Sequence, residues 1–157
     1  MFQIGDRVVY PMHGAGTIEN IEERTVLGEL RRYYILRIAH GNMQVMVPVD
    51  GSDQAGLRFV SDASVWPEVF AILKAESTPM DDNWNRRNRD NLERLKTGDI
   101  REVAAVVRNL SRIDRVKKLS TGEKKLLANA KQILSSELAY ANGSSEEEIL
   151  LMIDQAI

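Results

Sequence analysis

The chain has 157 residues, of which 43% are apolar and 28% charged, a composition typical of globular proteins. No apolar run approaches the roughly 18 residues of a membrane span, no signal peptide precedes the first strand, and the absence of cysteine excludes disulfides and thiolate chemistry, so we expect a cytoplasmic protein. The net charge of −2 is unevenly distributed: residues 81–135 carry 14 basic and 8 acidic side chains, and the flanking segments are acidic. This asymmetry favours a polyanionic partner for the basic block, although a solvated helix face would also account for it.

The first sixty residues are predicted to form about five short strands. β-Branched and aromatic residues, with partial alternation of apolar and polar positions, favour strands at 8–10, 17–21, 33–38, 43–48 and 57–60. Gly41 and Asn42 favour a hairpin turn between the third and fourth strands. So many short strands, separated by Gly and Pro, predict a small barrel-like or strongly bent sheet.

The apolar period becomes helical from Ser64 onward. A helix over 64–74 is followed by a break at 77–79, and Asp81 or Asp82 is predicted to cap the next helix. The later helices are predicted to begin at Asp99, Ser120 and Ser145. The resulting prediction is an α+β chain with a β domain at 1–61, a bridging helix and linker at 62–80, and an all-α domain of about four to five helices at 81–157.

No constellation of residues suited to catalysis is present. His13 and His40 lie far apart in the sequence and have no cysteine or further histidine with which to bind a metal. The glycines match neither a dinucleotide-binding nor a phosphate-binding loop, and no nucleophile motif occurs. We therefore expect no enzymatic activity, no cofactor and no metal.

Binding chemistry is concentrated near residue 84. Residues 83–89 place three arginines and three asparagines around Trp84, and these polar side chains suit phosphate oxygens and base edges. An indole among guanidinium groups is typical of a wedge or stacking platform at an unstacked base step. A second basic group is formed by Lys117, Lys118, Lys124, Lys125 and Lys131.

An alternative is that the helical domain binds a protein and no nucleic acid. This hypothesis predicts that Trp84 is buried against Leu92, because tryptophan is usually largely buried. It also predicts that the arginines form ion pairs with Asp81, Asp82 and Glu93. RNA binding through the small sheet is a third hypothesis, which the acidic charge of that segment disfavours.

The motifs resemble the CarD/CdnL family of bacterial transcription regulators in sequence and in order. They are IGDRVVYPMHGAG at 4–16, NWNRR at 83–87, LERL at 92–95, GD at 98–99, VAAVVR at 103–108 and LSTGEK at 119–124. The first is shared with transcription-repair coupling factors, whose helicase motor motifs are absent here. The resemblance implies a Tudor-like β domain that docks on the β subunit of RNA polymerase. It also implies a helical domain that contacts promoter DNA at the upstream edge of the transcription bubble.

Site residues follow from the same resemblance. The polymerase-binding positions are Arg24, Thr25, Val26 and Met46, where some relatives have an arginine in place of the methionine. The DNA-binding positions are Trp84, Arg86, Arg87, Arg89 and Lys124, with Lys125 a weaker addition. The implied activity is stabilisation of the open promoter complex through weak, largely sequence-independent contacts in the minor groove. We expect a monomer with no membrane or small-molecule partner.

Overall fold

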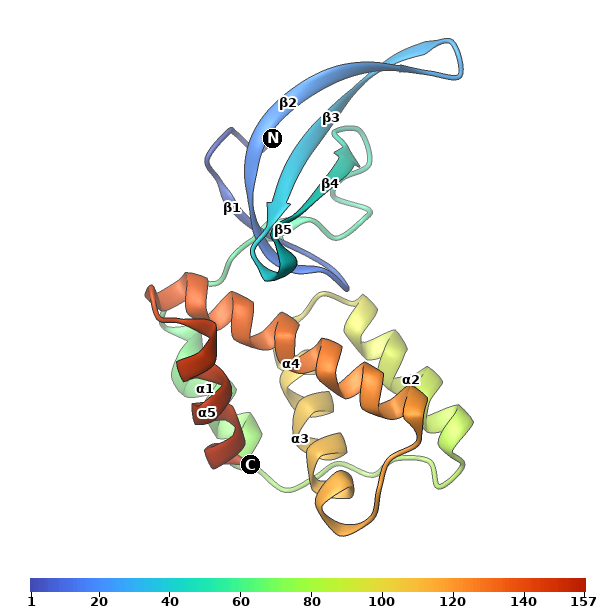
Figure 1. Ribbon diagram of the computed structural model, residues 1–157, viewed down its shortest axis with the longest axis vertical. Coiled ribbons are helices and arrows are strands. Elements are labelled where there is room, and N and C mark those ends of the chain that lie inside the picture. Colours follow the sequence, from blue (N-terminus) through green and yellow to red (C-terminus); the bar gives the residue numbers. More distant parts are fainter.

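The computed structural model describes residues 1–157, and its N-terminal part is an open antiparallel sheet (Figure 1). Its strands are β1 (Arg7–Tyr10), β2 (Gly14–Val26), β3 (Glu29–Ile38), β4 (Met43–Pro48) and β5 (Arg58–Phe59). They are arranged in the order β4-β3-β2-β1-β5, and a single 3-10 turn, His40–Asn42, joins β3 to β4. With the helices that follow, the sheet confirms the predicted α+β class.

One face of the sheet forms the first of two hydrophobic cores. Val8, Ile18 and Leu36 are fully buried there, and Ile21 and Val45 pack at its margin. Strand register explains the pattern, because Ile18 lies opposite Leu36, which in turn lies opposite Val45 on the same face.

The hairpin of β2 and β3 is much longer than the sequence suggested. The two strands remain paired out to Val26 and Glu29, whereas the predicted strands covered only 17–21 and 33–38. Leu27 and Gly28 form the turn with φ values of 52° and 80°, as two-residue hairpin turns require. β1 pairs with β2 only as far as Thr17, so the end of the hairpin projects beyond the sheet (Figure 1).

Five helices make up the rest of the chain: α1 (Val65–Lys74), α2 (Trp84–Lys96), α3 (Ile100–Val116), α4 (Thr121–Asn142) and α5 (Glu146–Ala156). The predicted caps Asp99, Ser120 and Ser145 are confirmed, since each side chain accepts a hydrogen bond from the first turn of its helix. The cap of α2 is neither Asp81 nor Asp82. It is Asn83, whose side chain accepts from the amides of residues 85 and 86.

The helical core includes α1. Its Val65, Val69 and Leu73 are buried in the same cluster as the apolar faces of α2, α3, α4 and α5. The helix predicted to bridge the domains is therefore packed into the helical body. No helix combines the length and apolar character that crossing a membrane requires.

The sheet rests on α4 near the glycine-containing start of β2 (Figure 1). The amide of Ala15 donates to Ser136 Oγ at 3.0 Å, and a Cβ at Gly14 would lie 2.8 Å from the same oxygen. A side chain at position 14 would therefore push the sheet and α4 apart. This close approach explains the glycine, whose φ of 95° also disfavours other residues.

Candidate nucleic-acid interface

Trp84 is the first residue of α2 and is exposed over 52% of its surface. The other tryptophan, Trp66, is half-buried and donates its indole N–H to the carbonyl of Leu138 at 3.2 Å. Leu92, the residue against which Trp84 would pack as part of the core, lies at the margin of the helical core without sealing the indole. The exposed indole contradicts the burial that the protein-binding alternative predicted.

The starts of α2 and α4 are joined by an ion pair between Arg87 and Glu123. Arg87 donates from Nε and Nη2 to the two carboxylate oxygens at 2.7 and 2.8 Å. Both side chains are buried, and Gly122 lies close to Asn88 on the neighbouring helix. Two residues 36 positions apart in the sequence are thus in direct contact, and the first turns of the two helices lie side by side.

The two charges stabilise each other in this buried position. Hydrogen bonds from Arg87 lower the pKa of Glu123, and the hydroxyl of Ser120 adds a further bond to the same carboxylate. The hydrogen bonds to Glu123 raise the pKa of Arg87. Because its guanidinium is occupied by Glu123 and only 8% of the residue is exposed, Arg87 offers little surface for the DNA contact predicted from the sequence.

Four other predicted residues remain at the surface around this junction. Arg86 and Arg89 on α2, and Lys124 and Lys125 on α4, are exposed and form no ion pair. The ion pairs that the alternative predicted for the arginines with Asp81, Asp82 and Glu93 do not form at Arg86 or Arg89. Lys131, grouped with these lysines from sequence, instead binds Asp154 of α5 at 3.1 Å.

Acidic residues border the basic group on one side. Asp81 and Asp82 directly precede the helix cap, and one Asp81 oxygen accepts the amide of Asn83 at 2.8 Å. Both aspartates are exposed and carry negative charge beside the start of α2. The amides at the helix start act in the opposite direction, since the positive end of the helix dipole lies there.

Three of the four residues predicted to bind polymerase lie on the projecting end of the β2–β3 hairpin. Arg24, Thr25 and Val26 are exposed, and Arg24 pairs only with its neighbour Glu22. No strand pairs with the outer edge of β2 over this stretch. The backbone groups on that edge are open to a further strand.

The tip of the hairpin also exposes two leucines that sequence reasoning missed. Leu27 is 99% exposed and Leu30 67% exposed. Both fell in a charged stretch between the predicted strands. The sequence signal that could have revealed them is Leu27 followed by Gly28 between two charged segments of similar length, a pattern that favours a hairpin turn.

Met46 lies on β4, the edge strand at the opposite side of the sheet from β5. It is opposite Ile35 on β3 and 42% exposed. Ile35 in turn lies opposite Asn20, four residues before Arg24. Met46 is therefore separated from Arg24 by two strand positions across the sheet and about 13 Å along it.

The two exposed regions are far apart in the molecule. The hairpin tip lies at one end of the long axis, and the start of α2 lies on the side of the helical body away from the sheet (Figure 1). The end of α2, by contrast, leads into Gly98, where a Cβ would lie 3.0 Å from Pro11 of the β domain. Because α2 is 13 residues long, Trp84 at its start lies about 20 Å from this contact between the domains at its end.

The protein is thus of the α+β class: a strand-rich domain with an open hairpin is joined to a helical domain that exposes an indole at the start of α2. The comparisons with known proteins agree with this class. Residues 2–61 match the family model "CarD-like/TRCF RID domain", and residues 68–154 match "CarD, C-terminal domain". The chain belongs to the CarD family.

A full-length relative supports the same conclusion. The chain is 42% identical over 149 residues to a protein of Bacillus subtilis (strain 168) described as "Putative transcription factor YdeB". The match covers 95% of this chain and 97% of the relative. A role in transcription regulation follows from this membership.

Proposed function

We propose that the protein binds the β subunit of RNA polymerase through its hairpin and promoter DNA through the start of α2, and thereby stabilises the open promoter complex. The observation that carries the proposal is the exposed indole of Trp84 at the start of α2, together with four exposed cationic side chains on the first turns of α2 and α4 that form no ion pair. An exposed tryptophan costs solvation energy in the free protein, whereas stacking on an unpaired base would remove it from water.

The DNA contacts that we propose are made by Trp84, Arg86, Arg89, Lys124 and Lys125. Arg87 has a different task here: through Glu123 it holds the first turns of α2 and α4 together. Because the two helix starts are already held together, binding does not first have to bring them into place.

The polymerase contact that we propose is made by the edge of β2 at 24–26, together with Leu27 and Leu30 at the tip. An open strand edge favours pairing with a strand of the partner, and the leucines would be buried by it. Met46 would lie at the border of this contact because it is set back along the sheet.

The activity is a shift in population and needs no catalytic group. A ligand that binds the melted duplex more tightly than the closed duplex raises the occupancy of the open state. Separate ends for polymerase and DNA would make the protein a tether whose second contact is intramolecular once the first has formed.

The test uses polymerase–promoter complexes assembled with the full chain. Trp84→Ala should leave binding to the β subunit unchanged and shorten the lifetime of the open complex. Trp66→Phe is the matched control, since it alters the tryptophan outside the proposed interface. An unchanged lifetime with Trp84→Ala, or failure of the wild-type chain to bind the β subunit, would overturn the proposal.

A further inference from the structure

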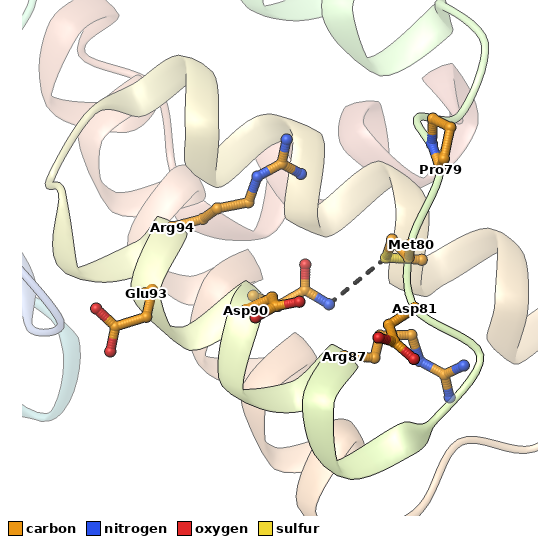
Figure 2. Close-up of a pocket in the computed structure, with 8 residues that line it drawn as sticks. Pro79, Met80, Asp81, Arg87, Asp90, Glu93 and Arg94 are labelled. Atoms are coloured by element: carbon orange, nitrogen blue, oxygen red, sulfur yellow. Dashed lines mark hydrogen bonds between the residues drawn. The ribbon is translucent and has the colours of Figure 1, made fainter.

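Residues 75–83 form a strap that joins α1 to α2 and leads directly to Trp84. The strap has no regular secondary structure. Met80 is half-buried, and all the other residues of the strap are exposed. Figure 2 shows Pro79, Met80 and Asp81 running past α2, with a groove of about 350 Å³ beside them. With so little apolar contact, the position of the strap depends on a few polar anchors.

The central anchor is Asn109 on α3, which holds Thr78 at two points. Its side-chain NH2 donates to the Thr78 hydroxyl at 2.7 Å, and its carbonyl oxygen accepts the Thr78 amide at 3.3 Å. Asn109 is 1% exposed and therefore well fixed. A rigid helix residue thus holds both the backbone and the side chain of one exposed residue.

Arg108 orients this asparagine from the neighbouring position. Its Nε donates to the Asn109 carbonyl oxygen at 3.0 Å, and its Nη1 donates to the carbonyl of Ile72 at 2.9 Å, near the end of α1. Arg108 is 3% exposed and forms no ion pair. Burial, with repulsion from Arg112 and Arg94, lowers its pKa. A buried cation without a carboxylate relies on every hydrogen bond it makes.

From Thr78 the strap is connected to the start of α2 by successive contacts. The Asn91 side chain of α2 donates to the sulfur of Met80 at 3.6 Å. Asp81 accepts the amide of Asn83, and Asn83 then caps the helix that begins at Trp84. The bonds at Thr78 therefore restrain the residues that place the indole.

We infer that Asn109, oriented by Arg108, is a positioning residue for the Trp84 surface: it fixes the strap at Thr78, and the strap keeps the capped start of α2 in the geometry that presents the indole. This role rests on the proposed function, since a fixed indole matters for the protein only if that surface binds. The residues involved touch no proposed ligand and act through the strap.

The test begins with the free full-length chain, with both tryptophans labelled with fluorine for NMR. Asn109→Ala should make the Thr78 amide exchange about fivefold faster, as expected for one lost hydrogen bond. It should also shift the Trp84 resonance and leave that of Trp66 in place. In polymerase–promoter complexes, the lifetime should fall towards that of the Trp84→Ala complex.

Two further variants separate positioning from general stability. Asn109→Asp should restore the wild-type resonance and lifetime, because a carboxylate still accepts from the Thr78 amide and from Arg108, and the Thr78 hydroxyl can donate to it. Thr78→Ala removes the hydroxyl contacts with Asn109 and Arg108 from the exposed side and keeps the amide bond to Asn109. It alters no core residue and decides the matter if Asn109→Ala fails to fold. Glu76→Gln, in the same strap but without a hydrogen bond, is the control.

The outcomes distinguish this role from the proposed function. If Trp84→Ala shortens the lifetime while Asn109→Ala and Thr78→Ala leave both resonance and lifetime unchanged, the positioning role is wrong. If the strap variants shift the resonance but no variant, Trp84→Ala included, alters the lifetime, positioning holds and the DNA-binding function fails.

Discussion

Arg58 of β5 and Glu137 of α4 form a two-point ion pair across the boundary between the sheet and the helices. Nη1 and Nη2 of the arginine lie 2.7 and 2.8 Å from the two carboxylate oxygens. The same guanidinium donates to the carbonyl of Gly98, and the carboxylate also accepts the amide of Ser61 at 3.0 Å. One pair therefore connects the sheet, α4 and the loop between α2 and α3, and together with the bond from Ala15 to Ser136 it holds the sheet against the helices.

Arg58→Ala should destabilise the protein by about 3 kcal/mol, because it leaves the buried carboxylate of Glu137 without its counter-ion. Urea denaturation measures the change in the free energy of unfolding. Arg31→Ala, which breaks the exposed pair with Glu29, is the control and should cost less than about 1 kcal/mol. Equal costs for the two variants would contradict a bracing role for Arg58.

Glu123→Gln should also destabilise the protein, by about 3 kcal/mol at neutral pH, since Arg87 then keeps a buried charge with only an amide as acceptor. The pKa of Glu123 is lowered in the folded state from an ordinary value near 4.5, so the carboxylate form favours folding. Its contribution is complete above about pH 4.5 and is lost as the pH falls through the lower folded-state pKa. The free energies of unfolding of the wild type and Glu123→Gln, measured by denaturation at several pH values, should therefore differ by a constant amount above that pH and converge in acid.

Lys124→Gln and Lys125→Gln should weaken DNA binding in a salt-dependent manner. Each phosphate contact that is lost reduces the slope of log affinity against log salt by about 0.9. Lys96→Gln, at the other end of α2, should leave the slope unchanged because Lys96 pairs with Glu93 away from the interface. Titrations of a forked promoter fragment at several salt concentrations measure these slopes, and identical slopes in all variants would remove these lysines from the interface.

Leu27→Ser at the hairpin tip should weaken binding to the polymerase β subunit roughly tenfold, as the loss of an apolar anchor at an interface does. The side chain is 99% exposed in the free protein, so the free energy of unfolding should change by less than about 0.5 kcal/mol. Val116→Ser alters another apolar residue that is largely exposed, at 88%, in the helical domain and should not affect this binding. Affinity measured with the isolated β subunit tests the contrast.

The fold was predictable wherever local chemistry determines it. Periodicity located the five helices, and the side chains of Asp99, Ser120 and Ser145 act as the caps that their positions indicated. The long hairpin was not predicted, since residues 22–32 are rich in charge and lack an apolar face. Its strands are held by cross-strand pairing, which a single segment does not reveal.

The site was predictable in composition and less so in geometry. The sequence identified Trp84 and the basic residues as binding candidates, but it did not distinguish the buried, paired Arg87 from the exposed Arg86. That distinction depends on Glu123, which lies 36 residues away in the sequence. Arg108 was similarly hidden within an apolar stretch, and its burial results from the packing of α1 and the strap against α3.

The open edge of the hairpin also poses a hazard to the molecule that carries it. An unpaired strand of this length is a template on which a second copy could add, and such addition leads to aggregation. Charged side chains occupy most of this stretch, at Glu22, Glu23, Arg24, Glu29, Arg31 and Arg32. Two copies that paired here would have to align these charges in register. The charged residues, which also obscured the hairpin in the sequence, therefore discourage self-association and favour a partner strand of complementary charge.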